Sequence, residues 1–481
     1  MPPFLSHSGL AALIGLPPQL MLVITLGFLF YIFRRDFRER PDVTSAIWLP
    51  TIWLLIIASR PVTQWLSILG LPFLGATSIE EGSPVDAFCF FALMALGIYV
   101  LNRRQVRFSS ILRDNGWLVL FFTYCFIAVF WSDFPATSFK RWLKIFGHPI
   151  MLLVLFSEPH PRVALVTLMK RCSYVLFPVS VLWMKYYPEI GRKCDEWGIM
   201  TNTGITQGKN ELGAVCVVIG LFLFWYFLQV WQQPKNLERR KELILAGFLL
   251  LVIGYCLRKA HSSTSTISFL LGVLVMLGLA MRFVNKRIIG LYAVTGILIL
   301  AVAQVCFDWY GSIVELSGHE STIEGRGHLW AFLWANDTSP IFGTGFESYW
   351  LGDRLQNVWA EFRWNPTHAH NGYLEAYINL GAVGLCFLIA LLVATFWKCR
   401  QDLLNDFQWG RFTMGSFIAI LAHNWTEAGF KGLSVIFFSL FLVMLRYRRL
   451  QNAEEITAPS EIISGVEEQE SELIYSSNNN W

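Results

Sequence analysis

Two histidines stand close together where the longest hydrophilic segment of the chain meets an apolar run. They are His368 and His370, in the sequence THAHNGYLEAY, and Asn371 follows directly. A neutral imidazole here can take a proton from a hydroxyl group while that hydroxyl forms a new bond. The alternative is that each histidine is satisfied at the start of a helix and does no chemistry. Of the two, His370 is the candidate general base.

Arg326 is the candidate anion-binding residue of the same segment. It lies in the sequence GRGHLW, four residues before Trp330. A guanidinium group offers a planar fork of N–H donors that suits phosphate oxygens, and a diphosphate leaving group would need such a partner. The alternative is a solvated arginine paired to the nearby Glu320 or Glu324.

The same segment is rich in aromatic residues. They include Trp309, Tyr310, Trp330, Trp334, Tyr349, Trp350, Trp359 and Trp364. Aromatic faces stack on the apolar faces of sugar rings, but Trp and Tyr also anchor loops at a membrane interface. For any single tryptophan here we expect the interface role.

The amino-acid composition indicates which class of protein carries these residues. Of the 481 residues, 54% are hydrophobic and 15% are charged, and the net charge is +4. The mean hydropathy of +0.48 is far above that of an average soluble chain. The sequence therefore predicts an integral membrane protein, and the small net charge gives no indication of nucleic-acid binding.

Long apolar runs recur along the chain and predict an all-α, polytopic bundle of about 12–13 transmembrane helices. The first run begins near residue 11 without the basic region of a cleavable signal peptide, so we expect a retained span. The expected helices are 11–33, 45–68, 86–101, 116–131, 144–157, 163–184, 211–231, 242–257, 265–283, 288–307, 372–397, 412–428 and 431–446.

Lys and Arg alternate between the loops in a way that predicts orientation. Basic clusters follow the first span at Arg34–Arg40, the third at Arg103–Arg113, and then every second span. The positive-inside rule makes this richer face cytoplasmic. Residues 1–449 then form the membrane domain, the large loop 308–371 is extracytoplasmic, and 450–481 is a disordered acidic cytoplasmic tail.

Further cations fall on the expected extracytoplasmic face. Arg141 follows WSDFP, Lys209 lies in TGITQGKNELG, and Lys259 precedes HSSTST. Charges at loop ends often snorkel to the interface and need no special role. Their convergence on the face of the large loop is nevertheless what a lipid-linked diphosphate substrate would require.

Several other chemistries lack a sequence basis. The nine cysteines lie mostly in apolar runs without CxxC spacing, which indicates small buried hydrophobes. Neither a phosphate-binding G-x-x-x-x-G-K-[ST] loop nor an H-E-x-x-H or G-x-S-x-G motif is present. We therefore expect no cofactor and no metal.

Taken together, these segments resemble the O-antigen ligase/polymerase superfamily. The resemblance rests on Arg326 with Trp330, on PIFGTGFESY, and on His370-Asn371 followed by Gly381 and Gly384. Weaker similarities are WSDFP, GKNELG and SSTST. The similar region runs from about 117 to 446.

The resemblance implies transfer of a glycan from an undecaprenyl-diphosphate carrier to an acceptor hydroxyl, without metal or nucleotide. Arg326 would bind the diphosphate and His370 would activate the acceptor, which is a growing polysaccharide or a lipid. His368, Asn371 and Trp330 would contact substrate. A second cation is implied, for which Arg141, Lys209 and Lys259 are candidates, and Gly381 and Gly384 would make a close helix contact.

Three functions remain open from sequence. A polymerase of exopolysaccharide or O-antigen repeat units is favoured by the resemblance in GKNELG and WSDFP. A ligase that moves a finished chain onto a lipid or protein shares the same residues. A solute transporter is the alternative of another class, for which Lys170 and Arg171 inside the span 163–184 are the main features.

Overall fold

The computed structural model describes residues 17–39, 42–71, 82–194, 200–307, 320–336 and 339–447, with side chains except at 297, 300–307 and 320–324. Three expectations lie outside the described residues. They concern the beginning of the span 11–33, the first part of the large loop with Trp309 and Tyr310, and the tail 450–481.

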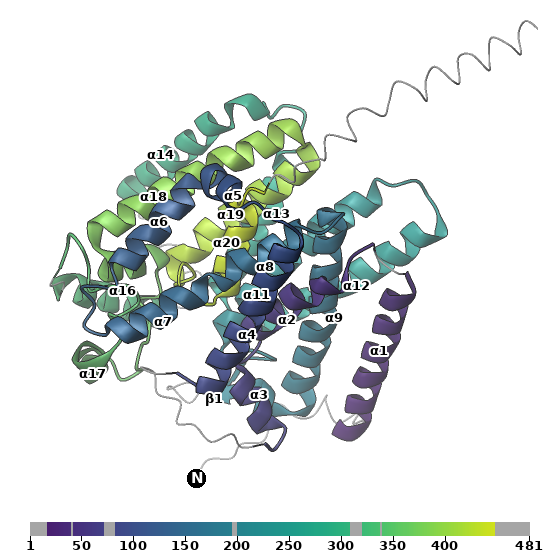
Figure 1. Ribbon diagram of the computed structural model, residues 1–481, viewed down its shortest axis with the longest axis horizontal. Helices are drawn as coiled ribbons and strands as arrows, with labels where there is room; N and C mark the ends of the chain where they lie inside the picture. The colour runs from purple at the N-terminus through teal and green to yellow at the C-terminus, as the bar shows by residue number, and fades with distance from the viewer. Residues whose placement is uncertain are drawn as a thin grey trace, which may run out of the picture.

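The described chain is built almost entirely from α-helices (Figure 1). The first half contains α1 Pro18–Glu39, η2 Ser45–Ile47, α2 Trp48–Ile57, α3 Val62–Ile68, α4 Pro84–Arg103, α5 Phe108–Asp114, α6 Gly116–Ile127, α7 Pro135–Ile145, α8 Gly147–Phe156, α9 Pro161–Tyr186 and α10 Pro188–Gly191. An antiparallel pair follows, β1 Arg192–Cys194 and β2 Met200–Asn202. The second half contains α11 Lys209–Trp231, α12 Leu237–Ala260, α13 Ser263–Gly278, η3 Lys286–Ile288, α14 Ile289–Phe307, α16 Glu320–Ala335, α17 Gly352–Glu361, α18 Gly372–Asn405, α19 Phe407–Thr426 and α20 Val435–Met444.

Every apolar run expected from the sequence contains a helix, and the all-α membrane class is confirmed. Among the described residues, five helices are long and apolar enough to cross a bilayer, namely α4, α9, α11, α12 and α18. A sixth span is possible from Ser45–Ile57 with Val62–Ile68, which are bent by 74°. Other runs form shorter helices such as α6, α8 and α20.

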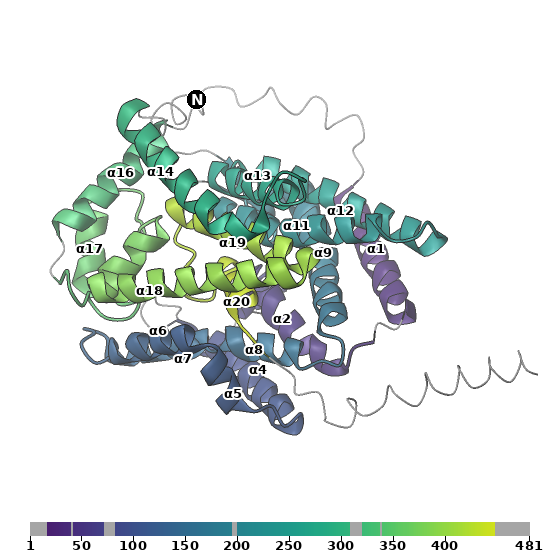
Figure 2. The ribbon, with the colours of Figure 1, turned by 90° about the horizontal axis from the view of Figure 1, so that it is seen from above.

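The most deeply buried helices are α9, α11, α19 and α20, and the other helices pack around them. α11 packs against α12 and α13, and α19 packs against α13 and α18. α16 and α17 lie at one end of the molecule and α1 at the other, as both views show (Figures 1 and 2). The elements of the large loop are therefore gathered at the end where α18 begins.

The described part of the large loop has a small hydrophobic core of its own. Leu329 and Leu333 of α16 pack with Leu355 and Val358 of α17 and with Trp350 between the two helices. Trp350 and Trp359 donate indole N–H bonds to Glu375 and to the carbonyl of Pro366. These two tryptophans therefore hold the loop together, whereas Trp334 is 64% exposed, as the expected interface role requires.

A turn of the loop is inserted into α18. Gly381 has φ 67°, and the backbone N–H groups of Ala382 and Val383 donate to the carbonyls of Pro340 and Ile341. A Cβ at Gly381 would lie 2.2 Å from the Ile341 carbonyl oxygen, so only glycine fits there. Gly384 approaches Tyr124 of α6. The expected close contact is present, with a loop at Gly381 and with a helix at Gly384.

The charges inside the span 163–184 are paired. The Lys170 ammonium lies 2.9 Å from Glu242, and the Arg171 guanidinium lies 2.8 Å from Asp36. Glu242 also accepts a bond from the Tyr226 hydroxyl and pairs with Arg35. This network ties α1, α9, α11 and α12 together, so both cations have a structural role that requires no transported substrate.

Candidate functional site

Helix α16 presents Arg326 and Trp330 on one face, since residues four apart in a helix lie one above the other. Arg326 donates from Nη1 to the Thr426 carbonyl and from Nη2 to Glu427, both at 2.8 Å. The Trp330 indole donates to the Ala369 carbonyl at 2.8 Å. One helix therefore contacts both the end of α19 and the backbone directly before His370.

His370 lies in a crowded position just before α18. Its φ of 49° is left-handed, a conformation that a non-glycine residue adopts only where its surroundings enforce it. Its ring lies 3.9 Å from that of His368 and 5.3 Å from that of Trp364, measured between centroids. Its Nδ1 lies 3.3 Å from Glu427 Oε2. The histidine is thus held by its backbone, by two rings and by one carboxylate.

Glu427, directly after α19, is the centre of the site. Its Oε1 accepts from Arg326 Nη2 and from Asn210 Nδ2, the latter at 2.6 Å. Its Oε2 lies 3.3 Å from His370 Nδ1 and 3.7 Å from His368 Nε2. The Glu427 side chain is only 8% exposed. One buried carboxylate therefore joins four polar side chains from three other segments of the chain.

These contacts fix the protonation state of His370. Burial, with His368 adding to it, lowers the pKa of His370 to about 4, although the Glu427 carboxylate raises it in part. The imidazole is therefore neutral at pH 7. Because Nδ1 faces a carboxylate, the ring proton belongs on Nδ1, and Nε2 keeps its lone pair. The geometry thus supplies a neutral ring nitrogen that can accept a proton.

A second carboxylate, Glu375 in the first turn of α18, holds the backbone next to His370. Glu375 accepts from the Ala369 backbone N–H at 2.7 Å, from Trp350 at 2.9 Å and from Lys431 at 3.2 Å. Lys431 also reaches the Thr367 carbonyl. Glu375 touches no functional side chain of the site. It fixes the position of the segment 367–370, which carries both histidines.

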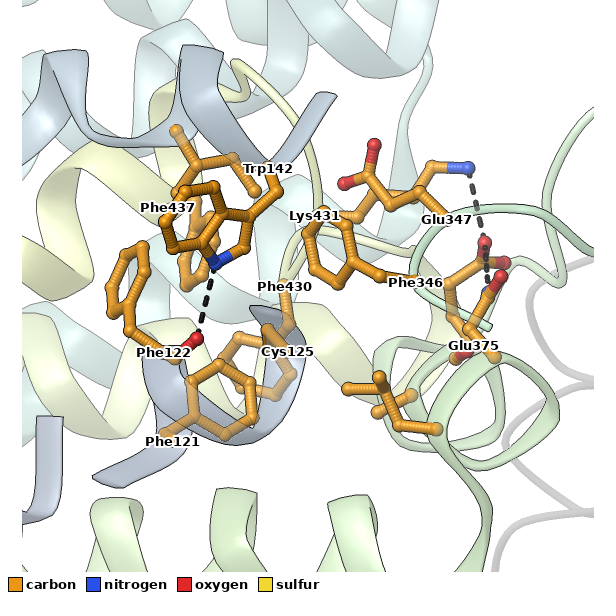
Figure 3. A pocket seen from close by; sticks show the side chains of 14 residues that line it. Phe121, Phe122, Cys125, Trp142, Phe346, Glu347, Glu375, Phe430, Lys431 and Phe437 are labelled. Carbon is orange, nitrogen blue, oxygen red and sulfur yellow. Dashed lines mark hydrogen bonds and ion pairs between the residues drawn. The ribbon is translucent and has the colours of Figure 1, made fainter. Parts of the chain in front are cut away.

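Figure 3 shows the small cavity behind this second carboxylate. The cavity is about 30 Å³ in volume, with aromatic walls that include Phe121, Trp142 and Phe430 and a polar side at Glu347, Glu375 and Lys431. A water needs roughly 10–15 Å³ of such volume, so the cavity has room for about two waters. It is too small for a sugar ring or a diphosphate.

The structure treats the other predicted residues differently. Asn371 caps α18, and its side-chain oxygen accepts from the N–H groups of Tyr373 and Leu374. Lys209 is the first residue of α11 and precedes Asn210, which binds Glu427. Arg141 donates to the Glu347 carbonyl. Lys259 lies over Tyr255 near the end of α12. We call Glu427 and the side chains that contact it, Asn210, Arg326, His368 and His370, the Glu427 cluster. Of the three candidate second cations, Lys209 adjoins this cluster in sequence, because it directly precedes Asn210.

Two residues of the cluster were missed in the sequence. Asn210 lies within GKNELG and Glu427 within HNWTEAGF. Glu427 falls in the expected span 412–428, and an ionisable residue in such a span is itself a signal of function. The SSTST segment also approaches the site, since the Thr264 hydroxyl lies 2.5 Å from that of Thr426.

His368, His370 and Glu427 also have the donor types of a metal site, because their ligand atoms lie within 4.8 Å of one another. Two imidazoles and a carboxylate would suit Zn²⁺. However, Glu427 already pairs with Arg326 and accepts from Asn210, and the guanidinium charge beside it opposes a second cation. The donor set therefore fits a metal poorly.

Comparison with known proteins relates part of the chain to a known family. Residues 246–389, which include Arg326 and His370, match the O-antigen ligase family model. The exopolysaccharide production protein ExoQ of Rhizobium meliloti is 24% identical over 300 residues, which cover 60% of this chain and 66% of that protein. Putative polysaccharide ligases of Rickettsia typhi and Rickettsia prowazekii are each 21% identical over 283 residues, covering 57% of this chain and 66% of the relative.

The matches thus span just under two thirds of the length of each relative. The range matched by the family model contains Arg326, His370 and the other main motifs of the sequence resemblance. The helical membrane architecture agrees with it. Residues 246–389 are therefore similar to the O-antigen ligase family, and a longer part of the chain is similar to a protein of exopolysaccharide production and to putative polysaccharide ligases.

Proposed function

We propose that this chain transfers a glycan from an undecaprenyl-diphosphate carrier to an acceptor hydroxyl, and that it polymerises lipid-linked repeat units during exopolysaccharide assembly. The observation that carries the proposal is the meeting of Arg326 and His370 on Glu427. The name of the Rhizobium relative, an exopolysaccharide production protein, supports the polymer class.

Arg326 would stabilise the departing diphosphate. A guanidinium has five N–H donors, and contacts with described atoms use two of those of Arg326. The remaining donors can bind phosphate oxygens while Glu427 keeps the group in place. A preorganised cation is worth more in a partly buried site than in water, because no reorganisation is needed as charge develops. Lys209 is the candidate second cation, because it directly precedes Asn210 in the sequence.

His370 would act as general base through Nε2. The acceptor oxygen forms its bond to the anomeric carbon while the bond from that carbon to the diphosphate oxygen breaks. The electron pair leaves with the diphosphate, and the acceptor proton passes to Nε2 and then to water. General base catalysis of this kind contributes roughly 10²–10⁴-fold.

A ligase is the second candidate, because both Rickettsia relatives are named putative polysaccharide ligases. The two activities would use the same base and the same cation, so they differ only in the acceptor and in the length of the donor glycan. The transporter alternative has lost its main support, since Lys170 and Arg171 pair with Glu242 and Asp36.

The proposal includes a location. The chain would lie in the bacterial inner membrane with the large loop and the Glu427 cluster on the periplasmic side and the acidic tail in the cytoplasm. The alternation of basic loops supports this orientation. The carrier and the growing polysaccharide would meet the chain at the outer leaflet.

The test is complementation of a strain that lacks the gene. Wild type should restore surface polysaccharide, whereas Arg326→Ala and His370→Ala should not, at equal amounts in the membrane. His328→Ala is the matched control, because His328 is an exposed histidine on α16. Accumulation of single lipid-linked repeat units would indicate a polymerase, and accumulation of long lipid-linked chains a ligase. Full restoration by both variants would refute the proposal.

A further inference from the structure

We propose that Glu427 is a positioning residue that sets both functional groups of the site at once. It would hold His370 with Nε2 free and would fix Arg326 beside it, so that base and diphosphate-binding group keep one relative arrangement. The inference rests on the proposed function. Glu427 lies outside the residues 246–389 that match the family model, so that match does not include it.

The two oxygens of the Glu427 carboxylate contact different functional groups. Oε1 faces the cationic side, where Arg326 lies at 2.8 Å and the Asn210 amide at 2.6 Å. Oε2 faces the imidazoles, with His370 Nδ1 at 3.3 Å. Since each oxygen serves one side, a displacement of Glu427 would move the base and the phosphate-binding group together.

The chain around Glu427 is itself firmly held. The Glu427 N–H donates to the His423 carbonyl at the end of α19, and the Asn424 side chain accepts from the Gly429 N–H at 2.8 Å. The turn that follows is bound at Gly432, whose N–H donates to Glu347 at 2.6 Å. Lys431 joins the same turn to Glu375. The backbone that carries Glu427 is therefore tied, through Lys431, to Glu375, which also holds the segment 367–370.

The chemical role follows from the position of the protons. The Arg326 and Asn210 donors keep Glu427 ionised, and an ionised carboxylate can only accept from Nδ1–H. When Nε2 takes the acceptor proton, the ring becomes an imidazolium beside a fixed negative charge. The proton remains on the ring, and Glu427 stabilises the charge that has formed there.

The alternative is that Glu427 is merely the counter-ion of Arg326. A counter-ion would keep α16 in place and would affect the amount of folded protein but not the properties of the imidazole. The two roles differ in a measurable way, because only the positioning role makes the effect of Glu427 depend on His370. The charged and titratable groups that act on the His370 ring are His368, Glu427 and Arg326.

The experiment is a double-mutant cycle with purified full-length chain and a lipid-linked glycan donor. Glu427→Gln should lower kcat by roughly 10²-fold, within the range of general base catalysis, with a smaller change in KM. The acid limb of the pH profile should move to lower pH, because the carboxylate that raises the His370 pKa has lost its charge. Glu361→Gln, an exposed carboxylate at the end of α17, is the matched control.

The double-mutant cycle also distinguishes a loss of function at the site from misfolding of the variant. Glu427→Gln should cost clearly less in the His370→Ala background than in wild type, since its effect through the base is then absent and only its effect through Arg326 remains. If Glu427→Gln is not recovered folded, Glu427→Asp takes its place and should move the acid limb in the same direction, because its shorter carboxylate lies farther from His370 Nδ1. Independent, multiplicative losses with an unmoved acid limb would overturn the inference. Wild-type activity of His370→Ala would instead refute the proposed function.

Discussion

Glu427 and Glu242 are both carboxylates with little exposure, and each contacts an arginine and other polar groups. Around Glu242, all charges are matched, since Arg35, Lys170 and Arg171 face Glu39, Glu242 and Asp36. Around Glu427, one arginine meets the carboxylate from one side and two imidazoles meet it from the other. In the first cluster every charged side chain is paired with one of opposite charge, whereas the second cluster contains imidazoles, which can change their protonation.

The difference separates a structural ion network from a reactive one. Glu242 joins helices, and each charged group of its cluster lies beside a group of opposite charge. In the Glu427 cluster, His368 is still 30% exposed, and the described contacts leave donors of Arg326 and Nε2 of His370 available. A buried charge alone does not indicate function, but a buried charge next to a partly accessible base does.

The largest expected effect is on stability and belongs to the structural cluster. Glu242→Gln leaves Lys170 and Arg35 without their common partner, and loss of one member of a buried pair costs about 3 kcal/mol. We expect a clearly lower Tm in a detergent thermal-shift assay, with unchanged activity per folded molecule. A folded Glu242→Gln protein with impaired kcat would break the distinction between the two clusters.

The same conservative substitution should act differently in the two clusters. Arg326→Lys keeps the charge but loses the planar fork that serves Thr426, Glu427 and the phosphate together, so we expect about 10–100-fold lower kcat/KM. Arg35→Lys should leave kcat/KM within about twofold, because a lysine can still pair with Glu242. Steady-state kinetics with the lipid-linked donor compare the two. Equal losses would contradict the assignment.

The pH dependence should come from the imidazole of the Glu427 cluster. Burial lowers the pKa of His370 to about 4, so the base is neutral at pH 7. Activity should fall about tenfold per pH unit once the pH is below this pKa. An unfolded histidine titrates near 6.5, so the folded state also loses stability as the pH falls from about 6.5 towards about 4. Tm measured across this range tests the stability effect, and activity measured from pH 7 to below the His370 pKa of about 4 tests the effect on the base. An acid limb near pH 6.5 would show that the ring is not desolvated.

A smaller effect is expected from the helix that carries Arg326. Trp330→Phe removes the indole N–H bond to the Ala369 carbonyl and keeps most of the packing. One such bond contributes about 1 kcal/mol, so kcat should fall by a few-fold through a less firmly held His370. Trp334→Phe is the control, because Trp334 is largely exposed. A sugar-stacking role for Trp330 would instead raise KM.

The smallest expected effect concerns metals. Since Arg326 and Asn210 already engage Glu427, excess EDTA should leave transfer activity unchanged, measured with the same purified chain. Loss of activity on chelation, with recovery on adding Zn²⁺, would instead assign His368, His370 and Glu427 as metal ligands.

Much of the fold could be read from the sequence, because apolar runs and their boundaries are local properties. Arg326 and His370 were also predictable, since both lie in recognisable short motifs. Their common partner was not: the carboxylates near Arg326 in sequence are Glu320 and Glu324, whereas the described partner is Glu427, a hundred residues later. The core formed by Trp350 and Trp359 was equally hidden, because aromatic residues in a hydrophilic loop resemble interface anchors.

The interruption of α18 at Gly381 has a consequence for the height of the site above the bilayer. The part from Ala382 to Asn405 has roughly 24 residues and a length of about 36 Å, which suffices for a hydrocarbon core of about 30 Å. The part before Gly381 is not needed for crossing. It can stand among the lipid headgroups, at the level where the phosphates of a lipid carrier emerge, and it begins directly beside His370.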